Sequence, residues 1–150
     1  MDHRTLVETS MTYWAAGDIE RVMTTLSDDV VYQVYVAQTA LPYGGEWSGK
    51  DAVRDVFFDV FALFDAIEFN PTILDVRDGI ARCQCQYVFR HRPSGEWLSG
   101  SCRLVCTIQN DLISRLDEFH DEPMVVAFTQ LAKQRALEGR GAPAHGKPWK

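Results

Sequence analysis

Residues 72–121 read TILDVRDGIARCQCQYVFRHRPSGEWLSGSCRLVCTIQNDLISRLDEFHD, and they carry most of the predicted β-structure. Runs rich in β-branched, aromatic and alternating apolar residues predict strands over 72–77, 80–91 and 97–109, with a fourth strand that begins at Leu112. The separating segments are Asp78-Gly79, Pro93-Ser94-Gly95 and Asn110-Asp111, which are typical of tight turns. The pattern therefore predicts an antiparallel meander.

The segments on either side of this meander are mainly helical in pattern. Apolar residues recur every three or four positions before residue 26, between 50 and 64, and after Pro123. We expect helices over 2–16, 18–26, 50–64 and 123–138, a strand over 30–38, and a Pro- and Gly-rich loop over 41–49. This order of elements predicts an α+β fold in which the N-terminal helices cover one face of a curved antiparallel sheet and close a pocket.

Composition narrows the functional classes. The chain has 150 residues and a formal net charge of −6, without a long Lys/Arg run, so we expect a single domain over 1–138, a flexible tail over 139–150 and no nucleic-acid partner. No apolar run is long enough to cross a bilayer, and the first residues lack a signal-peptide core, which predicts no membrane association and a cytoplasmic location. The four cysteines, Cys83, Cys85, Cys102 and Cys106, lack metal or redox spacing and are expected to be buried thiols.

Ionisable residues are most concentrated in LISRLDEFHD, residues 112–121. Strand alternation puts Leu112, Ser114, Leu116, Glu118 and His120 on one face, and Ile113, Arg115, Asp117, Phe119 and Asp121 on the other. The first face is otherwise largely apolar, so we expect it to line the pocket. Arg115, Asp117 and Asp121 are then expected to form a solvated or interface set of ion pairs.

Four pieces of the chain, taken together, resemble the ketosteroid-isomerase-like and SnoaL-like polyketide cyclase branch of the nuclear transport factor 2-like superfamily. They are WAAGDI at 14–19, SDDVVY at 27–32, LPYGGEWSG at 41–49, and ISR at 113–115 with EFHD at 118–121. The resemblance covers nearly everything before the tail. It implies a cone-shaped α+β barrel, usually homodimeric, that holds an apolar ligand.

The resemblance also tests the site residues. Steroid isomerases of this superfamily use a tyrosine and two carboxylic acids at positions that fall here on Ser10, Val34 and near Cys102. None of these side chains can perform that chemistry, so a true steroid isomerase is not expected. Epoxide hydrolases and cyclases of the same fold place an acid on the last strand, at the position of Glu118. Their tyrosine corresponds to Tyr32, but their remaining partner residues are missing.

The sequence thus predicts a pocket protein for a small apolar molecule, in which cofactor-free acid/base chemistry of an isomerase, lyase or hydrolase kind would depend on Glu118 and His120. Burial would raise the pKa of a pocket-facing carboxyl group toward the useful range. No metal or cofactor is expected. Two alternatives stay open: Glu118 and His120 as ordinary structural or solvent-facing groups, and a noncatalytic ligand-binding or interaction module. The expected ligand-binding residues are Trp14, Tyr32, Phe57, Phe61, Tyr87 and Cys102.

Overall fold

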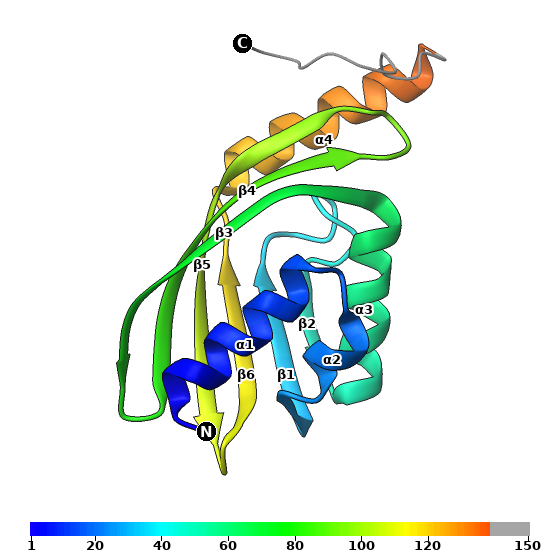
Figure 1. The fold of residues 1–150 in the computed structure, drawn as a ribbon. Helices are drawn as coiled ribbons and strands as arrows, with labels where there is room; N and C mark the ends of the chain where they lie inside the picture. Colours follow the sequence, from blue (N-terminus) through cyan, green and yellow to red (C-terminus); the bar gives the residue numbers. More distant parts are fainter. Residues whose placement is uncertain (139–150) are drawn as a thin grey trace.

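Four helices and six strands make up residues 1–138, the part of the chain that the computed structural model describes (Figure 1). The predicted tail, 139–150, lies outside these residues. In chain order the elements are α1 (His3–Ala15), α2 (Ile19–Met23), β1 (Leu26–Tyr35), β2 (Gly45–Ser48), α3 (Lys50–Leu63), β3 (Phe64–Arg77), β4 (Ile80–His91), β5 (Trp97–Gln109), β6 (Leu112–Phe119) and α4 (Glu122–Leu137).

The helix boundaries follow from local capping. The Asp2 carboxylate caps α1 by accepting a hydrogen bond from the Thr5 backbone N–H at 2.7 Å. Gly17 ends this segment at a φ of +72°, a conformation that favours glycine, and Asp18 then caps α2 through the Arg21 N–H at 3.1 Å. The break predicted at Gly17-Asp18 is therefore confirmed.

The meander is also confirmed. Strands β3 to β6 pair in sequence, each antiparallel to the next. The β3–β4 turn has positive φ at Asp78 and Gly79, and the β5–β6 turn has positive φ at Asn110 and Asp111. Two successive residues of positive φ are what a two-residue hairpin turn of type I′ requires.

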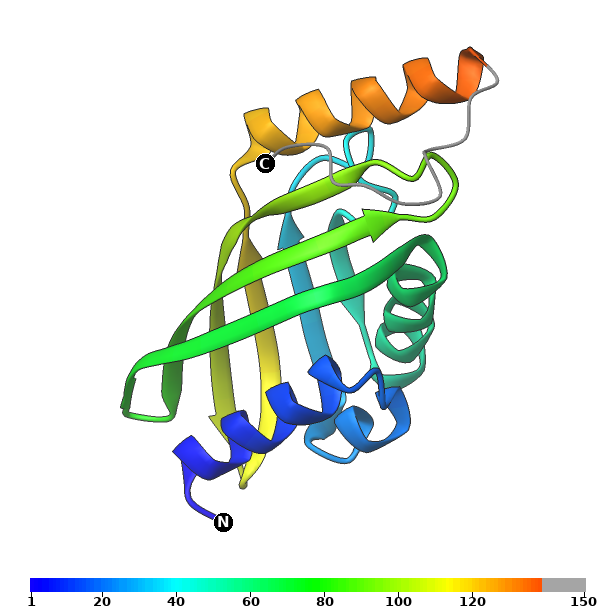
Figure 2. The ribbon, with the colours of Figure 1, turned by 45° about the horizontal axis from the view of Figure 1, so that its top comes forward.

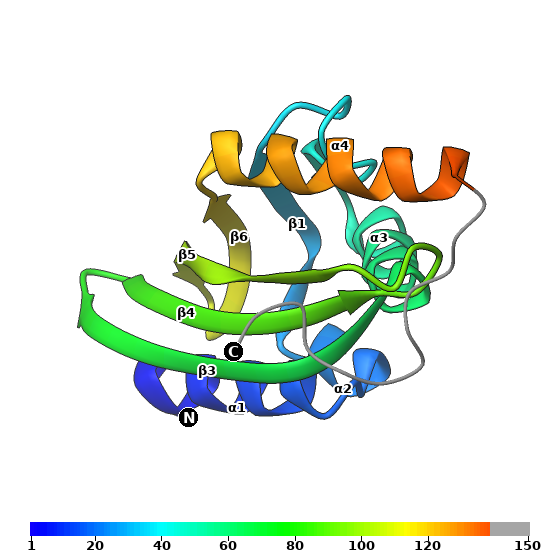
Figure 3. The same cartoon turned by 90° about the horizontal axis from the view of Figure 1, so that it is seen from above.

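One curved sheet contains all six strands, in the order β2-β1-β6-β5-β4-β3, as Figure 3 shows from above. The predicted α+β arrangement is confirmed, but the sheet is neither wholly antiparallel nor closed. β1 lies parallel to β6, with Tyr32 beside Leu116 and Val34 beside Glu118. Because β2 and β3 are the two edges and do not pair with each other, the sheet is an open mixed sheet and not a complete barrel.

Two strands were misjudged in the segments flanking α3. The predicted loop over 41–49 contains the short strand β2, which pairs with β1. The predicted strand over 72–77 is only the end of β3, which starts at Phe64 directly after α3 and passes through Pro71. Proline lacks an N–H, and β3 tolerates Pro71 because an edge strand needs hydrogen bonds on one side only.

Strand β6 also departs from simple alternation. Thr107 of β5 faces Arg115, whereas the next residue, Ile108, faces Ile113, so β6 has one extra residue there. Such a bulge changes which side chains face inward. Ile113 is 1% exposed and belongs to the core, which corrects its predicted place on the outer face.

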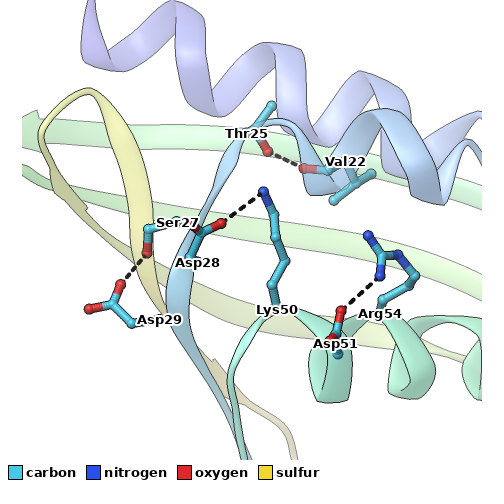
Figure 4. Close-up of polar contacts among 8 residues, drawn as sticks. All are labelled: Val22, Thr25, Ser27, Asp28, Asp29, Lys50, Asp51 and Arg54. Atoms are coloured by element: carbon cyan, nitrogen blue, oxygen red, sulfur yellow. Dashed lines mark hydrogen bonds and ion pairs between the residues drawn. The ribbon is translucent and has the colours of Figure 1, made fainter.

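The N-terminal helices cover the inner face of the sheet, and α4 crosses one end of it (Figures 1 and 2). Several polar contacts lie near the start of β1, and one of them, Lys50 with Asp28, joins α3 to β1 (Figure 4). Thr25 donates to the Val22 carbonyl, Lys50 of α3 lies 3.7 Å from Asp28, and Arg54 pairs with Asp51. At the other end α4 is attached to the loop after β1, because the Thr129 hydroxyl donates to the Ala40 carbonyl. Helices and sheet thus enclose one continuous hydrophobic core.

Candidate functional site

A small cavity of about 70 Å³ lies between the N-terminal helices and the inner face of the sheet. Trp14 of α1, Tyr32 of β1, Phe57 of α3 and Cys102 of β5 line it, as does Glu118 of β6. The Trp14 ring contacts the Phe57 ring with centroids 4.9 Å apart, and Phe57 contacts Tyr32 at 5.2 Å. The walls are therefore mostly apolar and aromatic, and Glu118 is the one carboxylate among the described lining residues.

Glu118 lies in a short hydrogen-bond chain. The Tyr32 hydroxyl donates to Glu118 Oε1 at 3.0 Å, and His120 Nε2 lies 2.6 Å from Oε2. Tyr32 and Glu118 meet because β1 and β6 are neighbours in the sheet, whereas Glu118 and His120 are two residues apart on one strand face. The structure thus brings together three of the residues singled out in the sequence.

The hydrogen-bonded residues around Glu118 are largely removed from water. The His120 side chain is 9% exposed and the Glu118 side chain 19%. Burial alone would lower the pKa of His120, but the hydrogen bond and the negative charge of Glu118 outweigh burial and raise the pKa above its usual value. Burial, reinforced by the Glu118 charge, holds the pKa of the Tyr32 hydroxyl well above its normal range. Tyr32 is accordingly a hydrogen-bond donor and not a base.

Tyr43 is a further buried tyrosine near Glu118, and the sequence analysis did not single it out. It is 7% exposed, and the nearby Glu118 charge adds to burial in raising the pKa of its hydroxyl. The Trp47 indole N–H donates to the Tyr43 carbonyl at 2.9 Å. Next to it, a Cβ at Gly44 would lie 2.2 Å from the Val36 carbonyl oxygen, so only glycine fits this close approach. The Tyr-Gly-Gly sequence in the predicted loop was the available signal.

Two of the predicted ligand-binding residues are not among the cavity lining. Phe61 packs behind Trp14, with ring centroids 4.7 Å apart. Tyr87 is buried on β4, and its ring centroid is 6.1 Å from that of His120. Tyr87 is therefore closer to the ionisable end of the site than to its apolar part.

The positions at which steroid isomerases carry a tyrosine and two acids fall on Ser10, on Val34 and near Cys102. Ser10 lines the cavity and accepts a hydrogen bond from the Thr25 hydroxyl at 2.8 Å, and Val34 is buried in the core. All four cysteines are free and buried, as predicted. Cys102 faces Cys85 across the β4–β5 pair, and the contact with the Cys85 thiol together with burial raises the pKa of Cys102, so neither observation favours a nucleophilic thiolate.

On the outer face of β6, Arg115 pairs with Asp117 at 3.0 Å, and the Tyr35 hydroxyl donates to Asp117 at 2.9 Å. Asp121 does not join them, contrary to the prediction. It follows the end of the strand and caps α4 by accepting from the Met124 N–H at 3.3 Å.

Within residues 1–138 no group of three or more His, Cys, Asp or Glu side chains is arranged to hold a metal ion. Among the same residues no helix is both long and apolar enough to span a membrane.

Comparison with known proteins supports the architecture. Residues 7–116 match the family model of the SnoaL-like domain. A search of curated proteins found no significant match.

Solved structures are similar in fold at low sequence identity. TerC, co-crystallised with polyporic acid, has a TM-score of 0.73 at 15% identity, covering 86% of this chain and 96% of its own. A proposed isomerase from Rhodopseudomonas palustris has a TM-score of 0.70 at 18% identity, covering 89% and 93%. A ketosteroid isomerase-like protein from Erwinia carotovora atroseptica has a TM-score of 0.66 at 16% identity, covering 80% and 94%. The chain therefore belongs to the SnoaL-like domain family, within the nuclear transport factor 2-like superfamily.

Proposed function

We propose that this protein is a cofactor-free acid/base enzyme, of the isomerase, lyase or hydrolase kind, that acts on a small and mostly apolar molecule. The observation that carries the proposal is the 2.6 Å contact between Glu118 and His120 beside an apolar cavity. A carboxylate and an imidazole in contact can pass a proton between them and a bound molecule. Positioned proton transfer of this kind contributes about 10²- to 10⁴-fold to a rate.

The burial of the pair favours a functional reading over a structural one. Taking two ionisable groups out of water costs several kcal/mol per ion, and apolar side chains of similar volume stabilise a core as well or better. Tyr32 and Glu118 line the cavity, and His120 contacts Glu118 without lining it. Ionisable groups with shifted pKa values, as Tyr32 and His120 have, cluster at active sites.

The volume of the cavity limits the substrate. At about 70 Å³ it is smaller than the engineered cavity of about 150 Å³ that accepts benzene in another protein. We therefore expect short carbonyl compounds, smaller than a six-membered ring, to enter without rearrangement of the walls.

The same small volume favours a second candidate function, a noncatalytic binding module for a small metabolite. Its cavity would use the same aromatic residues, and the Glu118–His120 pair would then only orient a polar group of the ligand. If the wild-type protein binds a small molecule without turning it over, and a Glu118 variant loses this binding, the second function is supported and not the first.

The test is exchange of the α-protons of ketones with deuterium oxide, followed by NMR. Acetone, butanone and cyclohexanone form a size series that begins within the expected substrate class and ends above it, at a ring too large for the cavity. The wild-type protein should exchange at least the smallest ketone faster than buffer, and Glu118→Gln should lower this rate by about 100-fold or more. Asp117→Asn is the matched control, because Asp117 is the adjacent carboxylate on the outer face and should leave the rate unchanged. Equal rates in the Glu118→Gln variant and the wild type would contradict the enzymatic proposal.

We also propose that the protein is a homodimer, as the family resemblance implies. Tyr35 and Phe119 are 43% and 41% exposed on the outer face and stack on each other at 4.3 Å, an aromatic pair that a partner subunit would cover. Light scattering should give twice the chain mass. A monomeric mass at micromolar concentration would contradict this proposal.

A further inference from the structure

A second hollow, of about 230 Å³, lies between α4 and the rest of the protein. Its walls come from the loop after β1, the junction of α3 with β3, the end of β4 and one face of α4. Figure 3 shows α4 beside the loop that follows β1. Among the described residues this hollow shares no lining residue with the cavity beside Glu118, so the two are separate.

Small side chains on α4 leave this space open. The Thr129 hydroxyl donates to the Ala40 carbonyl, which holds the helix against the loop at that point. Ala132 and Ala136 follow Phe128 at intervals of four residues, so these three side chains share one face of α4. The methyl groups of the two alanines are too short to fill the gap that Phe128 and Thr129 establish.

Three rings form the deeper part of the wall. They belong to Phe64, His91 and Phe128, and their centroids are 5.2, 5.6 and 6.0 Å apart for the pairs Phe64–His91, His91–Phe128 and Phe64–Phe128. Rings at such distances contact each other, and a further aromatic ring can pack on them in the same way. At about 230 Å³ the hollow is larger than the cavity of about 150 Å³ that accepts benzene. A single aromatic ring with a short substituent therefore fits.

His91 offers a hydrogen-bond donor to a ligand in this hollow. The Ser94 side chain is 2% exposed, and its oxygen accepts from the Glu96 backbone N–H at 3.2 Å and lies 2.7 Å from His91 Nδ1. Within residues 1–138, Nδ1 is the acceptor within reach of the buried Ser94 proton, so Ser94 donates to Nδ1. Burial lowers the pKa of His91, which favours the neutral ring, and its one proton is then on Nε2.

The lining charge is positive. Lys133 lines the hollow from its exposed side, and it forms no ion pair within residues 1–138. The nearby acids already have partners: Asp65 pairs with Arg92 at 2.8 Å. The buried Glu96 pairs with Arg135. No Asp or Glu lines the hollow in the described part of the chain, so a ligand with a negative charge is favoured over a neutral or positive one.

We propose that this hollow is a second binding site, which takes a single-ring aromatic carboxylate. The ring of the ligand packs on Phe64 and Phe128, its carboxylate lies toward the Lys133 ammonium group, and His91 Nε2–H is a further donor. The Lys133 side chain can lay its methylene groups along the apolar wall while its charge stays in water. This inference goes beyond the proposed function, because the site is a different one and has the opposite preference for charge: the Glu118 carboxylate in the first cavity would repel the same ligand.

The probe is 4-fluorobenzoate, followed by ¹⁹F NMR during titration with the full-length protein. The wild type should bind it saturably, with a Kd of about 1 mM or lower. 4-Fluorobenzamide has the same shape without the charge and should bind more weakly. Lys133→Gln should weaken binding of the carboxylate about 2- to 5-fold, and Lys133→Arg should restore it. Lys50→Gln is the matched control, because it removes the same charge at the start of α3, beside Asp28, and should leave binding unchanged.

A second pair of variants tests the position of the site. Ala132→Leu places a larger side chain in the hollow and should weaken binding by about 10-fold or more, since the ring then loses its space. Ala127→Leu makes the same substitution at an exposed position of α4 that does not line the hollow, and should bind like the wild type. Thermal unfolding checks that each variant is folded. If Ala132→Leu melts lower than the wild type, Ala136→Leu, on the same face nearer the end of the helix, takes its place.

Each outcome decides the proposal. Saturable binding that Ala132→Leu removes and Ala127→Leu keeps would support the site. Equal affinity for 4-fluorobenzoate and 4-fluorobenzamide would overturn the carboxylate preference, and unchanged binding in Ala132→Leu would overturn the site itself. No saturable binding by the wild type would overturn both. The ketone exchange assay with Glu118→Gln reports on the proposed function separately, because it depends on the other cavity.

Discussion

Replacing Tyr32 with phenylalanine removes a single hydroxyl group from the centre of the site. That hydroxyl donates to Glu118 Oε1 at 3.0 Å, and it is the contact that joins β1 to the charged end of β6. The aromatic ring, which packs on Phe57 with centroids 5.2 Å apart, stays in place. The variant therefore measures the hydrogen bond with little change in packing.

The expected loss follows from the charge of the acceptor. A hydrogen bond to a charged group contributes about 1.5–3 kcal/mol to stability, more than one between neutral groups. Tyr32 is fully buried, so water cannot easily replace the missing donor. For a domain of this size such a loss lowers the melting temperature by about 3–10 °C.

A double-mutant cycle with Glu118→Gln isolates the pair. Chemical denaturation of the wild type, both single variants and the double variant should give a coupling energy of about 1 kcal/mol or more. Ser27→Ala is the control, since the Ser27 hydroxyl donates to the Asp29 carboxylate at a similar distance, 2.8 Å, but at an exposed position. Its effect should stay below about 0.5 kcal/mol. Equal losses in Tyr32→Phe and Ser27→Ala, or no coupling in the cycle, would refute the buried Tyr32–Glu118 hydrogen bond.

Three further predictions concern pH, packing and thiols. The pKa of His120 is raised in the folded state, so the stability that His120 contributes is present below its unfolded pKa of about 6.5 and is lost as the pH rises through the higher folded pKa. The difference in unfolding free energy between the wild type and His120→Gln should therefore shrink from pH 6 to pH 9. A constant difference would contradict this prediction. Using the difference cancels the opposite contribution of His91, whose pKa burial lowers. Gly44→Ala should lower the free energy of unfolding by about 2–3 kcal/mol or more in denaturant titrations, because its Cβ would meet the Val36 carbonyl. This loss should exceed that of Gly17→Ala, where nothing lies within 4 Å of the added Cβ and only the positive φ is strained. The reverse order would show that the loop can move. All four cysteines are buried, so a thiol reagent should label them only after unfolding, and rapid labelling of the native protein would show that the sheet opens.

Local patterns were sufficient for most of the fold. The period of apolar residues gave the helices, and turn residues such as Asp78-Gly79 gave the meander, because both signals depend on neighbours in the chain. The parallel β1–β6 pair was missed, since no local signal records which strand fills the free edge of another. The inner position of Ile113 was also missed, because a one-residue bulge reverses the alternation without any distinctive residue type.

The site was partly predictable for the same reason. Glu118 and His120 are two residues apart, and alternation alone brings them together. Tyr32 was placed through the family resemblance, and its contact with Glu118 needed the strand order. Tyr43 was missed because the Tyr-Gly-Gly sequence indicates only a tight loop, and the place of the tyrosine depends on how that loop packs before β2, where the Trp47 indole N–H donates to the Tyr43 carbonyl.

The parallel pairing of β1 with β6 also has a consequence for how the protein reaches its native state. Tyr32 and Glu118 are 86 residues apart in the chain, so their contact closes a long loop. Contacts of such separation slow folding, because the entropy of loop closure is lost before the contact is made. During synthesis β1 leaves the ribosome well before β6, so the edge of β1 that pairs with β6 stays unpaired until β6 has been made. We therefore expect the site to form late, after the β3–β5 meander. Misassembly of this protein should begin at the unpaired edge of β1.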